Sequence, residues 1–161
     1  MRIFYISYFA DKNECPDRMV VLSAQKKISY IKSCLNENCD QLYIISTALP
    51  TKDKPKSKKK TIYFSDKEIH VYLPFRWKHF RKVQTQINLL LYLLKNVKSG
   101  DLIVFYHSLI YINPLKIFHM IRKNKIVMEF NDWYKLHFTD ESSINSTEKI
   151  EEKIIRITDA Y

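Results

Sequence analysis

An alternation of strand-like and helix-like segments constrains the fold of this chain more than any other feature. The apolar run RIFYISYF (2–9) suits a buried strand. A helical stretch with an apolar stripe follows from Pro16 and Asp17, and QLYIIST (41–47) suits a second strand. Because a strand–helix–strand unit joins parallel neighbours through a right-handed crossover, we expect a parallel sheet.

The same alternation continues along the rest of the chain. Further strands are predicted in TIYFSDKEIHVYLPF (61–75, two short strands), LIVFYHS (102–108) and KIVMEF (125–130). Helices are predicted over 77–97, from Pro114, and from Asn145 or Ser146. We therefore predict one α/β domain over residues 1–161: a Rossmann-like, open, mainly parallel sheet with helices on both faces and a short β-hairpin.

The composition excludes several kinds of site. Gly100 is the only glycine, which rules out the glycine-rich dinucleotide fingerprint and the P-loop, because both need several glycines close to phosphate. The three cysteines form no C-x-x-C pair and have no histidine at zinc-finger spacing. We expect no bound metal, no cofactor and no disulfide framework.

The net charge of +10 favours an anionic partner, whether nucleic acid, a membrane surface or a phosphorylated substrate. Much of it is local, since KDKPKSKKK (52–60) is mostly lysine and makes residues 50–60 a basic loop. We favour a solvated loop over a dedicated binding patch there. The longest apolar run, INLLLYLL (87–94), is far shorter than the roughly 20 residues that span a bilayer, so we expect a cytoplasmic protein.

Polar side chains follow several predicted strands, at the edge where open parallel sheets bind ligands. They are Tyr8 with the loop containing Arg18, His107 with Ser108, and the group Glu129, Asn131, Asp132 and Trp133. Each has a structural alternative: Asp132 can cap a helix, His107 can be a satisfied half-buried group, and Trp133 can be core. For the group as a whole we favour a functional role, because independent strand ends agree.

These segments, together with KIVMEFNDWY (125–134) and EKIIRITDAY (152–161), resemble a known family. The chain resembles the N-terminal half of bacterial glycosyltransferases of the GT-B fold. It is most similar to family 4 members from capsule and exopolysaccharide gene clusters. In those proteins one strand ends in His-Ser and the next in a Glu-x-x-Asp-x-Tyr-like pattern, here His107–Ser108 and Glu129–Tyr134.

The resemblance implies two Rossmann-like domains facing across a cleft, of which this chain is the acceptor-binding half. A C-terminal nucleotide-sugar domain, absent from these residues, would hold the donor, so we expect the chain alone to be inactive. The acceptor would be a glycan or a polyprenyl-linked glycan. A base must take the proton of the acceptor hydroxyl, and the candidates are Asp132, then His107, then Glu129. Expected acceptor-binding residues are Tyr8, Arg18, Ser108, Asn131 and Trp133.

Such acceptors lie at the inner face of the plasma membrane, where the positive charge of the chain would attract anionic lipids. The segment RWKHFRK (76–82) has the composition of an interfacial helix start, although an ordinary surface helix start explains it too. The residues expected at the membrane surface are Arg76, Trp77, Lys78, Phe80, Arg81 and Lys82.

Two other classes of protein remain open at the level of sequence. A basic nucleic-acid-binding module agrees with the charge and the many aromatic residues, but no RNP-like, KH-like or helix-turn-helix pattern is visible. A Rossmann-like interaction domain without a small ligand is the second alternative.

Overall fold

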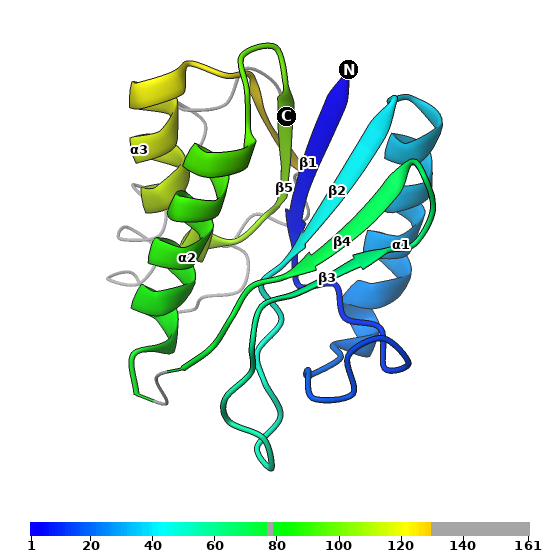
Figure 1. The fold of residues 1–161 in the computed structure, drawn as a ribbon, viewed down its shortest axis with the longest axis vertical. Coiled ribbons are helices and arrows are strands. Elements are labelled where there is room, and N and C mark those ends of the chain that lie inside the picture. Colours follow the sequence, from blue (N-terminus) through cyan, green and yellow to red (C-terminus); the bar gives the residue numbers. More distant parts are fainter. Residues whose placement is uncertain (77–78, 130–161) are drawn as a thin grey trace, which may run out of the picture.

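The computed structural model describes residues 1–76 and 79–129, which form a six-stranded sheet in the order β3-β4-β2-β1-β5-β6 (Figure 1). Five strands run parallel, and the edge strand β3 pairs antiparallel with β4. The predicted fold class is therefore confirmed, hairpin included. The strands are β1 (Arg2–Ser7), β2 (Gln41–Ser46), β3 (Lys60–Tyr63), β4 (Glu68–Tyr72), β5 (Leu102–Tyr106) and β6 (Ile126–Glu129).

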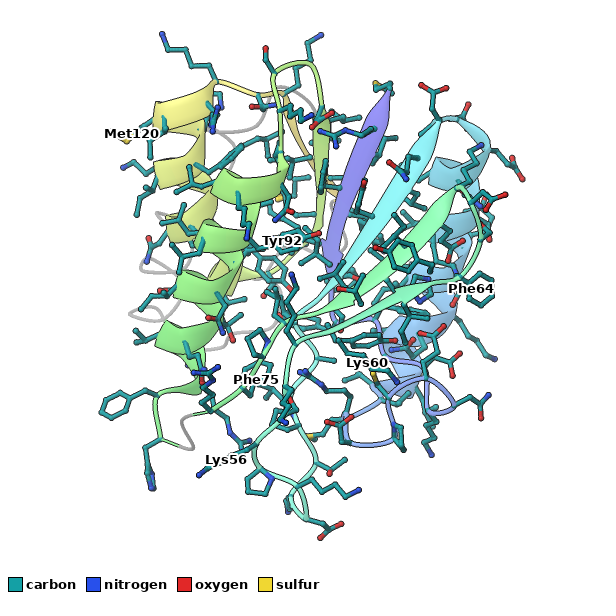
Figure 2. All side chains as sticks on the ribbon, viewed as in Figure 1. Lys56, Lys60, Phe64, Phe75, Tyr92 and Met120 are labelled. Atoms are coloured by element: carbon teal, nitrogen blue, oxygen red, sulfur yellow. The ribbon has the colours of Figure 1, made fainter. Side chains whose placement is uncertain are left out.

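Helices cover both faces of the sheet (Figure 1). Helix α1 (Leu22–Glu37) lies on one face, and α2 (Arg81–Asn96) and α3 (Ile112–Arg122), which the short 3-10 helix η1 (Leu109–Tyr111) precedes, lie on the other. Side chains alternate along β1, so that Phe4 packs with the α2–α3 core and Tyr5 with the α1 core. Figure 2 shows Tyr92 between α2 and the sheet, whereas Met120 points outward from α3.

Strand β1 lies between β2 and β5. Helix α1, which leads to β2, packs on one face of the sheet, and α2, which leads to β5, packs on the other. The strand order therefore reverses at β1 and β5. In open α/β sheets, this switch point opens a crevice beyond the carboxyl ends of the strands. The fold thus directs attention to the residues that follow β1 and β5. No helix within the described ranges is both long enough and apolar enough to cross a membrane.

Two predicted helix starts are wrong. Helix α1 begins at Leu22 instead of Pro16, because the preceding residues pair with the segment after β2. Arg18 forms an antiparallel bridge with Pro50, and the Met19 N–H donates to the Leu49 carbonyl at 2.7 Å. Helix α2 begins at Arg81 instead of residue 77. Residues 77 and 78 lie outside the described ranges, and Phe75 before them pairs with Ser57.

Candidate functional site

A cavity of about 920 Å³ lies at the carboxyl edge of the sheet, at the switch point. Its walls come from residues that follow β1 and β2, from the end of β5, and from the first turns of α1 and α2. The lining residues are Tyr8, Met19, Val21, Ala24, Lys27, Thr47, Ala48, Leu49, Arg81, Lys82, Thr85, Tyr106 and Ile110. The cavity lies at the edge of the sheet at which the sequence predicts a binding site.

The cavity is electropositive. Lys27 of α1 and Arg81 and Lys82 of α2 line it, and none of its described lining residues is acidic. The first turns of both helices also lack acidic residues and side-chain caps. Free N–H groups at a helix start carry partial positive charge. The buried Nε of Arg81 has no hydrogen-bond partner among the described residues. The cavity therefore favours an anionic ligand.

One wall of the cavity is apolar. Met19, Val21, Leu49 and Ile110 line it, and the first three are exposed large hydrophobic residues. Apolar side chains that stay in contact with water at the mouth of a cavity gain free energy when an apolar ligand covers them. The lining of the cavity is therefore complementary to a molecule with both a negative charge and an apolar part.

Hydroxyl groups form a second wall. The Tyr8 hydroxyl is hydrogen-bonded to Ser108 Oγ. Thr47 donates its hydroxyl to the Ser7 carbonyl at 3.2 Å and accepts a hydrogen bond from the Tyr111 hydroxyl at 2.6 Å. Burial raises the pKa of both Tyr8 and Tyr111. These phenols therefore stay protonated near neutral pH and keep the wall fixed through neutral hydrogen bonds.

Glu129 is the last residue of β6 and pairs with Tyr106 of β5. Its carboxylate lies next to Lys27, which lines the cavity. Its Oε2 accepts a hydrogen bond from the Tyr5 hydroxyl at 2.6 Å, and its Oε1 lies 3.7 Å from Lys27 Nζ. Burial raises the pKa of the Glu129 carboxyl, and the Tyr5 hydrogen bond and the Lys27 charge only partly oppose this. A carboxylate with a raised pKa holds a proton more strongly, as a general base should.

The structure brings together several of the predicted site residues. Tyr8 lines the cavity, Ser108 is bound to the Tyr8 hydroxyl, and His107 is buried directly beside Ser108 in the chain. Arg81 and Lys82, expected at the membrane surface, also line the cavity.

Arg18 does not take its predicted place in the acceptor site. Its guanidinium is buried and donates to the Ala48 and Leu73 carbonyls at 2.7 Å each, so it is absent from the lining of the large cavity. Five residues with predicted roles lie outside the described residues: Trp77, Lys78, Asn131, Asp132 and Trp133.

Sequence reasoning missed Lys27, Thr47 and Thr85 as cavity residues. Thr47 directly follows β2, as Tyr8 follows β1, so the strand-end rule applied to β2 would have found it. Lys27 and Thr85 carry no such signal, because their position depends on where α1 and α2 begin. Thr85 also bonds the Arg81 carbonyl at 2.9 Å, within its own helix.

No protein-family model matches the chain, and a search of curated proteins finds no significant match. The interpretation of the site therefore depends on its own geometry and chemistry.

Proposed function

We propose that this chain is the acceptor-binding half of a glycosyltransferase, which moves a sugar from a nucleotide-sugar to a glycan or polyprenyl-linked acceptor in bacterial surface-polysaccharide biosynthesis. The observation that carries the proposal is the switch-point cavity, in which cations, hydroxyls and an apolar wall meet. A polyprenyl-diphosphate-linked acceptor has the matching chemistry: a diphosphate, sugar hydroxyls and an apolar chain.

Each wall has a role in this proposal. Lys27, Arg81 and Lys82 bind the diphosphate oxygens through charge-assisted hydrogen bonds. The apolar wall around Met19 and Leu49 contacts the first part of the prenyl chain. The nucleotide-sugar is held by a second Rossmann-like domain that faces this edge of the sheet.

The transfer step requires a base. As the acceptor oxygen bonds to the anomeric carbon, the nucleoside diphosphate leaves with the electron pair of the broken bond, and the base takes the hydroxyl proton. Asp132 is the first candidate, followed by His107 and Glu129. Among the two described candidates, Glu129 is supported by the raised pKa of its carboxyl and its ion pair with the cavity residue Lys27.

Contact with the inner face of the plasma membrane is part of the same proposal. Phe80, Val83, Ile87 and Leu91 are exposed at steps of three or four residues, and so form one apolar stripe along α2. Arg76 and Lys82 are exposed beside its start. An apolar stripe with flanking cations is typical of helices that lie at a bilayer surface.

The test is binding of farnesyl diphosphate, followed by isothermal titration calorimetry, with farnesol and inorganic pyrophosphate for comparison. We expect farnesyl diphosphate to bind more tightly than either. The double substitution Lys27→Gln/Arg81→Gln should weaken binding at least tenfold, because each hydrogen bond to a charged group contributes about 1.5–3 kcal/mol. The matched control Lys26→Gln/Lys95→Gln, on exposed positions of the same two helices, should change the affinity less than about twofold.

Equal loss in both double variants would contradict the proposal, as would farnesyl diphosphate binding no tighter than pyrophosphate. The nucleic-acid alternative makes a different prediction, a salt-sensitive affinity for arbitrary oligonucleotides without specific binding of farnesyl diphosphate. Large aromatic residues such as Tyr5, Tyr72 and Phe105 are fully buried and cannot stack on bases, so only exposed rings such as Tyr30, Tyr63 and Phe64 could serve in that alternative.

A further inference from the structure

A second, smaller cavity of about 210 Å³ lies between the loop that precedes α1 and the end of the basic loop. It is lined by Cys15, Asp17, Arg18, Lys58, Lys59 and Lys60. It shares no lining residue with the large cavity. The two are therefore distinct sites.

Arg18 is a buried cation that forms no direct ion pair with a described residue, although the neighbouring Asp17 carboxylate acts on its charge. It is 3% exposed, and no carboxylate among the described residues forms an ion pair with it. Two of its N–H groups bond backbone carbonyls, but the buried Nε has no hydrogen-bond partner in the described part of the chain. Buried charges in proteins are normally paired. An anion in this cavity would supply the missing partner.

The lysines make the excess of positive charge larger. The cavity is lined by four cationic side chains and one carboxylate, that of Asp17. Burial raises the pKa of the Cys15 thiol, so this side chain adds no negative charge near neutral pH. Lys60 Nζ donates to the Glu14 carbonyl, and Lys59 Nζ lies 5.1 Å from the centre of the Tyr92 ring. A lysine ammonium has three N–H groups, so Lys60 keeps two of them for a ligand, whereas Lys59 is directed to the Tyr92 ring.

Backbone pairing holds both sides of this cavity in place. On one side, the Thr51 N–H donates to the Asp17 carbonyl at 2.8 Å, next to the bridge between Arg18 and Pro50. On the other side, Ser57 and Phe75 exchange two hydrogen bonds of 2.8 Å, and β3 begins at Lys60. Backbone pairing thus holds these cationic residues close together, although the basic loop as a whole is solvated.

From this geometry we propose that the small cavity is a binding site for a small soluble anion bearing a phosphate or diphosphate group. The Arg18 Nε–H and the ammonium groups of Lys58 and Lys60 are its donors. This site lies outside the proposed acceptor cavity and goes beyond the proposed function.

The experiment titrates inorganic phosphate and pyrophosphate at constant ionic strength, followed by calorimetry. It uses the Lys27→Gln/Arg81→Gln protein as background, so that the large cavity does not contribute. We expect saturable binding of pyrophosphate. Adding Lys58→Gln/Lys60→Gln should weaken it about tenfold or more, whereas the matched control Lys52→Gln/Lys54→Gln, in the same loop but outside the cavity, should change it less than about twofold.

A thermal melt of each variant establishes that it is folded. No saturable pyrophosphate binding, or the same loss in both lysine pairs, would overturn the proposal. Vesicles containing phosphatidic acid test the other source of phosphate. If the vesicles displace pyrophosphate less effectively than free phosphate does, the ligand is a soluble anion, as proposed. If only the vesicles bind, the proposal fails. Loss of farnesyl diphosphate binding alone would count against the proposed function and leave this site unaffected.

Discussion

Glu129 is a charged residue in surroundings that disfavour its charge, and this has a measurable effect on stability. Its side chain is 10% exposed, and burial raises the pKa of its carboxyl above the ordinary value. The folded protein therefore binds this proton more tightly than the unfolded chain. Stability must then fall as pH rises from about 4.5 through the folded pKa, because the unfolded state loses its proton first.

We predict that Glu129→Gln removes this loss. Relative to the wild type, the variant should gain stability as pH rises above about 4.5. Urea unfolding at several pH values measures the difference. Glu37→Gln, on an exposed residue of α1, serves as the control. A wild type that becomes more stable than Glu129→Gln as pH rises would show that the Tyr5 and Lys27 contacts outweigh burial.

The site could be predicted in part because some residues are placed by strand ends. Tyr8 and Ser108 follow β1 and β5, and this order fixes their edge of the sheet. Arg18 lies outside the lining of the large cavity, and nothing in the local pattern shows that its guanidinium turns inward to two carbonyls. Lys27 was missed for a related reason: a helix position faces a cavity only if the tertiary packing of that helix directs it there.

At the scale of elements, substitutions at two turn residues should change the free energy of unfolding in opposite directions. Gly100 precedes β5 at φ +86, and nothing lies within 4 Å of a Cβ added there. Any residue that replaces it therefore loses stability only through the left-handed backbone conformation. Lys123 follows α3 at φ 53, a left-handed position that usually belongs to glycine. We predict that Gly100→Ala destabilises the fold by about 1 kcal/mol and that Lys123→Gly stabilises it by up to about 1 kcal/mol.

Thermal or urea unfolding measures both changes. Lys123→Ala separates the two effects at that position, because it removes the charge but keeps the Cβ that is disfavoured there. If Lys123→Gly and Lys123→Ala have the same stability, the left-handed backbone is not the source of the gain.

The strands were predictable from sequence, but the helix starts were not. Apolar runs such as RIFYIS and QLYIIS follow directly from burial on both faces of a parallel sheet. Helix α1 starts late because residues 17–19 pair with residues 49–51, a contact between segments about thirty residues apart. The local periodicity of apolar residues cannot predict such a contact. The contact depends on how the sheet places two segments that are distant in sequence.

For the whole molecule, the net charge of +10 and the apolar stripe of α2 together predict binding to anionic membranes. We expect the protein to co-sediment with vesicles containing phosphatidylglycerol at low salt and to be released at high salt. The reason is that each nearby Lys or Arg contributes about 1 kcal/mol and that this attraction is screened by salt.

The apolar stripe makes the prediction specific to one face of the molecule. Ile87→Gln/Leu91→Gln removes two exposed residues of α2 and should lower the bound fraction severalfold at low salt. Tyr30→Gln/Tyr63→Gln removes two still more exposed residues from α1 and β3 and should leave the bound fraction unchanged. Failure to bind at either salt concentration would remove the membrane from the proposal. Equal loss in both pairs would mean that charge alone, without a preferred face, brings the protein to the bilayer.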